Sequence, residues 1–211
     1  MNKLRIGICG WGNVATGLFK TLQSNAAEIK KRSNLEIEII AIGARRDNPK
    51  CDPGNIVVER DIFKIIDHDI DVIVELIGGV DVARELILKA LNAKKHVVTA
   101  NKAVIFNHGD ELFSVANKNG VKLLYESSVC AGTPIIKLLN QELAANKISK
   151  ISGMLNGTSN YILSNMEEGM EFEPTLKLAQ EKGYAEPDPS FDIEGTDAAH
   201  KIGILSSLAF G

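Results

Sequence analysis

Short apolar runs alternate with amphipathic stretches along the first part of the chain. The apolar runs are rich in β-branched residues, whereas the stretches between them repeat apolar positions every three or four residues, as helices do. The pattern predicts strands at residues 4–9, 35–42, 72–77, 96–99 and 121–126, and helices at about 14–24, 82–93 and 109–119. This alternation is typical of a parallel sheet covered by helices, because parallel neighbours need crossover connections.

The pattern changes after a glycine-rich segment at residues 127–134. Beyond it we predict helices at residues 135–145, 158–166, 175–182 and 197–210, a strand at 150–155, and a loop rich in Gly, Pro, Ser and acidic residues at 183–196. The sequence therefore predicts an α/β protein with a parallel-sheet domain at residues 1–133 and an α+β domain at residues 134–211.

Composition and charge narrow the class of protein. The 211 residues are 45% hydrophobic and 24% charged, as in ordinary globular proteins. A net charge of −3 without a basic cluster argues against nucleic acid as a partner, and no apolar run approaches the ~20 residues of a membrane span. We expect no secretory signal in this sequence, because its first apolar run is only a few residues long and ends in glycines. Cys9, Cys51 and Cys130 form no C-x-x-C pair, so we also expect reduced thiols and a cytoplasmic location.

Gly10, Gly12 and Ala15 form the pattern G-x-G-x-x-A between the first predicted strand and the first predicted helix. In such a turn the first glycine permits the tight bend, the second admits a pyrophosphate close to the backbone, and the small third residue lets helix and strand pack closely. The helix N-terminus adds unpaired N–H groups and a partial positive charge. The motif predicts a dinucleotide site, and a packing turn without a ligand is the alternative.

The end of the second predicted strand bears on the choice of dinucleotide. NAD enzymes usually place an Asp or Glu there, which binds the ribose 2′-hydroxyl. This chain has Arg45 and Arg46, and guanidinium groups bind a 2′-phosphate instead. The arginine pair favours NADP as the cofactor. Asp47 could instead bind the ribose 2′-hydroxyl of NAD, so NAD is a second candidate. The remaining alternative is a solvated strand end that binds no ligand.

A lysine stands among apolar positions of the last predicted helix. Lys201 follows Asp197 by four residues, so the two lie on one helical face. One interpretation is a surface ion pair. The other is a proton donor whose pKa is lowered by burial and raised by Asp197. The acidic loop before this helix does not fit an EF-hand, because Lys201 occupies the position that requires a bidentate Glu.

The chain resembles homoserine dehydrogenases. The resemblance rests on the glycine turn and on motifs at residues 75–79, 99–103, 126–134, 156–163 and 183–201. It implies reversible oxidation of L-homoserine to L-aspartate 4-semialdehyde with NAD or NADP, in the branch that leads to threonine, methionine and isoleucine. It also implies a Rossmann-type domain followed by an α+β catalytic and dimerisation domain, a small-molecule substrate, and a homodimer in the full-length protein.

The resemblance assigns catalytic and substrate-binding roles to individual residues. Lys201 matches the acid/base lysine of the family, and Lys102 matches a lysine at the junction of nicotinamide and substrate. Glu186 and Asp197 match residues that hold homoserine, whose ammonium group suits a carboxylate partner. Asp192 is a further candidate for substrate binding.

Two further sets of residues are implied by the resemblance. The positions expected in the dinucleotide groove are Gly10, Gly12, Asn13, Val14, Ile77, Gly78, Thr99 and Lys102, together with Arg45 on account of its charge. The positions that match a monovalent-cation site are Glu126 and the carbonyls of Val129, Ala131 and Thr133. Oxygen ligands of this kind suit a hard cation such as Na⁺.

Three expectations complete the sequence-based hypothesis. The catalytic domain of the family is longer than the part matched here, so the domain at 134–211 is expected to be incomplete and this chain alone to have little turnover. One alternative is an acylating aldehyde dehydrogenase with Cys130 as its thiolate nucleophile. Another is a nucleotide-binding module without catalysis.

Overall fold

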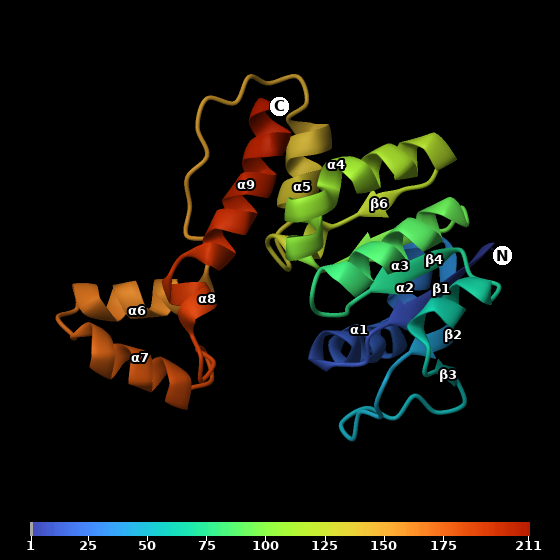
Figure 1. The fold of residues 1–211 in the computed structure, drawn as a ribbon, viewed down its shortest axis with the longest axis horizontal. Helices are drawn as coiled ribbons and strands as arrows, with labels where there is room; N and C mark the ends of the chain where they lie inside the picture. Colours follow the sequence, from blue (N-terminus) through green and yellow to red (C-terminus); the bar gives the residue numbers. More distant parts are fainter. Residues whose placement is uncertain (1) are drawn as a thin grey trace. The chain divides into compact units, whose positions relative to one another are not determined.

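The computed structural model describes residues 2–211 of the chain (Figure 1). It consists of two compact units that divide between Ser128 and Val129, a few residues before the sequence-predicted domain boundary at 133/134. Within residues 2–211, no helix is both long and apolar enough to cross a membrane.

The first unit contains one parallel sheet. Its strands are β1 (Asn2–Cys9), β2 (Leu35–Gly43), β3 (Val57–Glu59), β4 (Val72–Glu75), β5 (His96–Thr99) and β6 (Leu123–Leu124). They lie in the order β3-β2-β1-β4-β5-β6, and each neighbouring pair is parallel. The chain runs outward from β1 in both directions, and ligands of such sheets bind at the carboxyl ends of the strands beside this switch point.

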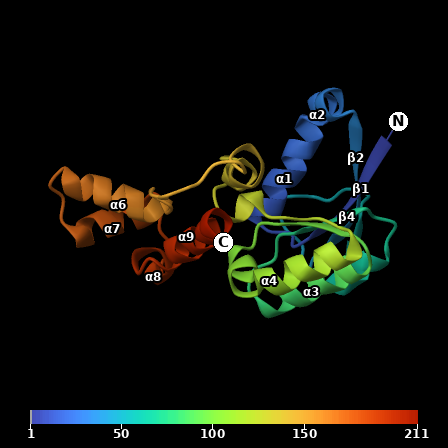
Figure 2. The same ribbon diagram turned by 90° about the horizontal axis from the view of Figure 1, so that it is seen from above.

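Helices cover both faces of this sheet, as the alternating pattern predicts. The helices α1 (Asn13–Ser24) and α2 (Ala26–Ser33) lie on one side, and α3 (Asp81–Asn92) and α4 (Lys102–Asn119) lie on the other (Figure 2). Ile8, Phe19 and Ile42 belong to the apolar cluster between the first helix and the sheet. Among residues 2–128, the short 3₁₀ helices are η1 (Ile62–Asp67) and η2 (Glu126–Ser128).

Several element bounds differ from the sequence prediction, for identifiable reasons. Helix α4 starts at Lys102 instead of near residue 109, because the Asn101 side chain accepts a hydrogen bond from Val104 N and caps it. Helix α2 was not predicted, since it buries no residue among 26–33 and so has no apolar stripe. Strand β6 is shorter than predicted: it is an edge strand that pairs with β5 alone.

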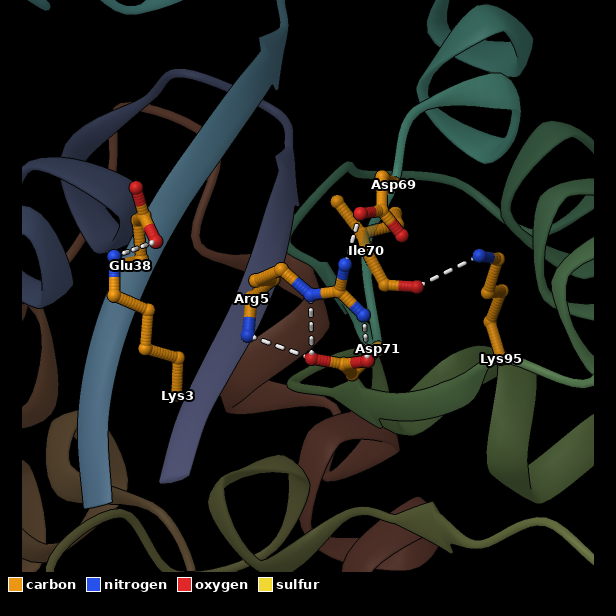
Figure 3. A network of polar contacts seen from close by, with 7 residues as sticks. All are labelled: Lys3, Arg5, Glu38, Asp69, Ile70, Asp71 and Lys95. Carbon is orange, nitrogen blue, oxygen red and sulfur yellow. Dashed lines mark hydrogen bonds and ion pairs between the residues drawn. The ribbon is translucent and has the colours of Figure 1, made fainter. Parts of the chain in front are cut away.

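An ionic cluster joins the amino ends of β1 and β4. The backbone N and the Nε of Arg5 donate to Asp71 Oδ2 at 2.9 and 3.1 Å, and Nη2 donates to Oδ1 at 2.7 Å (Figure 3). The Arg5 guanidinium holds the pKa of Asp71 below its ordinary value by hydrogen bonding. Lys95 Nζ donates to the carbonyl of Ile70 at 2.7 Å. These contacts brace the end of the sheet opposite the glycine turn.

The second unit is built from helices. They are α5 (Ile135–Lys137), the π-helical turn η3 (Leu138–Glu142), α6 (Gly157–Glu167), α7 (Phe172–Glu181), α8 (Ser190–Ile193) and α9 (Thr196–Phe210). The strand predicted at 150–155 is wrong, because these residues have no regular structure. Within residues 129–211 no other strand exists with which this segment could pair, and a strand without a partner is not stable.

Candidate functional site

The glycine turn after β1 has the geometry that its sequence predicts. Gly10 has φ +98°, and a Cβ atom there would lie 2.6 Å from the carbonyl oxygen of Leu76. Only glycine therefore fits this position. Gly12 is different, because a Cβ atom on it would meet nothing within 4 Å. Helix α1 begins at the next residue, so its unpaired N–H groups face the same open space.

A cavity of about 630 Å³ opens at this turn, at the carboxyl ends of β1 and β2. Its volume is in the range of small-molecule and cofactor sites. Of the residues predicted to line a dinucleotide groove, those in its wall are Gly10, Gly12, Asn13, Arg45, Ile77 and Gly78. The structure therefore brings together the end of β1, the end of β2 and the loop after β4.

Three other predicted groove residues lie outside this wall. Val14 is on α1 with an exposed side chain. Thr99 ends β5 and is fully buried, and its hydroxyl donates a short hydrogen bond to Glu75. Lys102 is the first residue of α4.

The arginine pair at the end of β2 lies in the cavity wall. Within the described residues, neither Arg45 nor Arg46 has an ion-pair partner, so both guanidinium groups are available to an anion. The carboxylate of Asp47, the candidate partner of an NAD ribose, forms an ion pair with Arg60 at 2.6 Å. Arg60 also donates to the carbonyl of Ala44 at 3.2 Å. The local charge at this edge is therefore positive.

Side-chain hydrogen bonds hold the loop after β2 against the glycine turn. Asn48 Nδ2 donates to the carbonyl of Trp11 at 3.0 Å and to Thr16 Oγ1 at 2.9 Å. The indole N–H of Trp11 donates to the carbonyl of Cys51 at 3.0 Å. Sequence reasoning missed Asn48, because it belongs to no motif and its partners are more than thirty positions away.

In the second unit, α9 places Lys201 and Asp197 on one face. Lys201 Nζ lies 2.9 Å from Asp197 Oδ2 and donates to the carbonyl of Leu155 at 2.8 Å. The side chains are 18% and 7% exposed. This ion pair is thus enclosed and held from two segments, unlike the surface pair that was the alternative interpretation.

Asn156 connects Asp197 to Asp192. Its amide nitrogen donates to Asp192 Oδ1 at 2.8 Å and to Asp197 Oδ2 at 2.9 Å. Its side-chain oxygen accepts from Ser159 N at 2.8 Å and so caps α6. The hydroxyl of Thr158 donates to Asp192 Oδ2 at 2.8 Å. Asn156 is in the motif at 156–163, but its contacts with the two carboxylates could not be read from the sequence.

The remaining candidate residues of the second unit lie in loops. Glu186 is exposed, in the loop between α7 and α8. Of the positions matched to a cation site, Glu126 is in η2 of the first unit, and Val129, Ala131 and Thr133 are in the turn that opens the second. The carbonyl of Thr133 accepts a hydrogen bond from Ile135 N at 2.8 Å. Residues 2–211 contain no cluster of three or more His, Cys, Asp or Glu side chains that could hold a metal ion.

Comparison with known families agrees with this geometry. A model described as the NAD-binding domain of homoserine dehydrogenase matches residues 10–126, and a model of homoserine dehydrogenase matches residues 134–211. A curated homoserine dehydrogenase of Pseudomonas aeruginosa is 51% identical over the whole chain, which spans 49% of that protein. The chain spans about half the length of the curated relatives it matches.

Solved structures give the same result. A homoserine dehydrogenase of Thiobacillus denitrificans superposes with a TM-score of 0.94 at 45% identity, over 100% of this chain and 50% of that one. A hyperthermophilic archaeal homoserine dehydrogenase in complex with NADPH superposes with a TM-score of 0.85 at 29% identity, over 99% of this chain and 70% of that one. Neither alternative hypothesis, the Cys130 enzyme or the non-catalytic module, is favoured by these matches. The chain belongs to the homoserine dehydrogenase family.

Proposed function

We propose that the protein interconverts L-homoserine and L-aspartate 4-semialdehyde with a nicotinamide dinucleotide, a step towards threonine, methionine and isoleucine. The observation that carries the proposal is the enclosed pair of Lys201 and Asp197, in a chain whose first unit has the dinucleotide turn. A lysine in these surroundings has a defined position and a defined partner, as a proton-transfer group requires.

The residues of the first unit fit a bound dinucleotide. Gly12 offers open space beside the N-terminus of α1, where a pyrophosphate would accept hydrogen bonds from backbone N–H groups. Arg45 lies in the cavity wall, and Asp47 is already paired with Arg60, so a 2′-phosphate is attracted and NADP is the proposed cofactor. A bound nicotinamide would supply the hydride-transfer chemistry.

Lys201 is proposed to move the proton of the substrate hydroxyl. An ammonium group has three N–H donors, and Asp197 and Leu155 accept two of them. The third position on the nitrogen is proposed to face the substrate oxygen. In the oxidation direction the lone pair of the neutral amine takes the hydroxyl proton as the carbon is oxidised, and in the reverse direction the resulting ammonium group returns this proton to the oxygen. Lys102, at the positive end of α4, is proposed to act at the junction of nicotinamide and substrate.

Carboxylates are proposed to hold the ammonium group of homoserine. Glu186 is exposed in the loop before α8 and can reach a ligand. Asp197 and Asp192 are held by Asn156, so their oxygens have fixed positions. Fixed carboxylates bind a cationic group at a lower cost in side-chain entropy than mobile ones do.

Three further features are proposed for the whole protein. A monovalent cation is proposed to bind to Glu126 and to the carbonyls of Val129, Ala131 and Thr133. All of these ligand atoms are oxygens, which suit Na⁺ or another hard cation. The carbonyl of Thr133 has a second lone pair besides the one that Ile135 N uses. The homodimer and the cytoplasmic location remain proposals; the free thiols of all three cysteines suit a reducing compartment.

The direct test is homoserine-dependent reduction of NADP and of NAD at matched concentrations. We expect reduction with homoserine and none with its deoxy analogue 2-aminobutyrate, and a lower KM for NADP than for NAD. Because the chain spans about half of its relatives, the assay includes a protein of their length that contains this sequence. Absence of homoserine-dependent reduction in the longer protein would refute the proposed reaction.

A further inference from the structure

Glu75 is an acidic residue in the core of the first unit. It ends β4, and its exposed fraction is 0%. Burying a carboxylate is costly unless hydrogen bonds replace its water, and burial raises the pKa of Glu75. The strand positions before it are all apolar, so packing alone would not select an acid here.

The carboxylate of Glu75 joins two loops. Oε1 accepts a hydrogen bond from the backbone N of Ile77 at 2.8 Å. Oε2 accepts a short hydrogen bond from the hydroxyl of Thr99, which ends β5. The Thr99 oxygen in turn accepts from the backbone N of Asn101 at 2.9 Å. Glu75 therefore connects the loop after β4 to the turn after β5.

Asn101 closes this set of contacts into a ring. Its Nδ2 donates to the carbonyl of Ile77 at 3.2 Å and to that of Gly79 at 2.7 Å. Its Oδ1 accepts from Val104 N and caps α4. The loop after β4 is thus held at a backbone N–H by Glu75 and at two carbonyls by Asn101. Ile77 and Gly78 of that loop line the cavity.

The order of the strands says which part of a dinucleotide this loop would meet. The turn after β1 is the pyrophosphate site, and β2 with Arg45 lies on one side of it, where the adenosine ribose binds in such folds. β4 and β5 lie on the other side of β1. The loop held by Glu75 is therefore on the nicotinamide side.

We propose that Glu75 is a positioning residue that fixes the loop after β4 in the shape that receives the nicotinamide half of the dinucleotide, with Asn101 as its partner. The proposal rests on the dinucleotide-binding part of the proposed function and not on the reaction. Glu75 itself touches no ligand in this scheme, because Ile77 and Gly78 form the wall.

The test compares the dissociation constants of two ligands by titration calorimetry. NADPH occupies both halves of the site, whereas adenosine 2′,5′-bisphosphate lacks the nicotinamide half. Glu75→Gln replaces one acceptor by an amide donor, and Asn101→Ser retains an N-cap acceptor but removes the donors to Ile77 and Gly79. For both variants we expect the Kd of NADPH to rise about 10-fold or more and that of the bisphosphate to change less than about 2-fold.

Ile73→Val is the matched control for a change in the core. Ile73 is fully buried on β4, two residues before Glu75 and on the same face, but it has no polar link to the loop. This variant should lower the unfolding midpoint and leave both constants within about 2-fold of the original.

Distinct outcomes separate the failure of this proposal from that of the proposed reaction. The proposal is overturned if Glu75→Gln and Asn101→Ser leave the Kd of NADPH unchanged, or if they raise the Kd of NADPH and that of the bisphosphate by the same factor. Original protein that binds neither ligand overturns the dinucleotide site and the role of Glu75 together. Original protein that binds NADPH but does not oxidise homoserine overturns the reaction alone.

Discussion

Lys201 Nζ lies 2.9 Å from Asp197 Oδ2, one turn away on α9, and the same oxygen accepts a hydrogen bond from Asn156. The carbonyl of Leu155 accepts from Lys201 as well, so neighbouring residues 155 and 156 hold both members of the ion pair. A helix alone would let a lysine at this spacing move among several rotamers. Asp197 and the segment at residues 155–156 together restrict it to one position.

Lys201→Ala should lower kcat for homoserine oxidation by about 100-fold or more, because general acid–base catalysis contributes factors of that size. The Kd of the dinucleotide should stay within about 2-fold, since Lys201 is on α9 and the dinucleotide turn is at Gly10 to Asn13. Lys177→Ala, on the exposed part of α7, is the control and should change neither quantity. Equal losses of kcat in the two variants would contradict the role of Lys201.

Asn156→Ser should raise KM for homoserine or lower kcat, with a combined loss in kcat/KM of about 10-fold or more. Serine also caps helices, so α6 is retained, but its short side chain cannot bridge Asp192 and Asp197. The unfolding midpoint should therefore fall only slightly. Steady-state kinetics and thermal unfolding check the two halves of this prediction. A large loss of stability with kcat/KM unchanged would show that Asn156 serves the fold alone.

Gly10→Ala and Gly12→Ala should affect different properties. At Gly10 a Cβ atom would meet the Leu76 carbonyl at 2.6 Å in a left-handed backbone, so this variant should unfold at lower temperature. At Gly12 a Cβ atom has open space, so the stability of the variant should be retained. The added methyl group would occupy the cavity, however, and should raise the Kd of NADPH by about 10-fold or more. Calorimetry and thermal unfolding measure both. If Gly12→Ala bound NADPH with unaltered affinity, the pyrophosphate would not bind at this turn.

Asp71→Asn should destabilise the first unit near neutral pH, by a free energy of unfolding on the order of 1 kcal/mol after allowance for solvent screening. The pKa of Asp71 is lower in the folded state because Arg5 hydrogen-bonds its charged form. Its contribution is therefore complete above the unfolded pKa of ~3.9 and is lost as pH falls through the lower folded value.

Urea unfolding of both proteins at pH 7 and near pH 2 checks the sign of this dependence. The difference between original and variant should shrink at the acidic pH. Glu38→Gln, which breaks the exposed pair with Lys3, is the control and should have a smaller effect at pH 7. A difference that grows towards acidic pH would contradict the contribution assigned to Asp71.

The local sequence pattern was enough to predict a parallel sheet, the glycine turn, and the placement of Lys201 and Asp197 on one face of a helix. Strand β5 has its predicted bounds, and α9 begins one residue before the predicted helix. These features depend on neighbours within a few positions, where the period of a strand or a helix decides which side chains share a face. The strand at 150–155 failed for the opposite reason, because a strand depends on a partner elsewhere in the chain.

The sequence by itself therefore determined the class of the first unit, a parallel sheet covered by helices, together with the dinucleotide turn and the family of this protein. Only the tertiary structure decided that Glu75 is buried and linked to Thr99, and that Asn156 connects Asp192 with Asp197. The physical reason is the range of the contacts: these hydrogen bonds join residues 24 to 41 positions apart, and their geometry arises when the chain packs. A buried carboxylate or amide has its role set by the partners that replace its water, and those partners come together only in the folded chain.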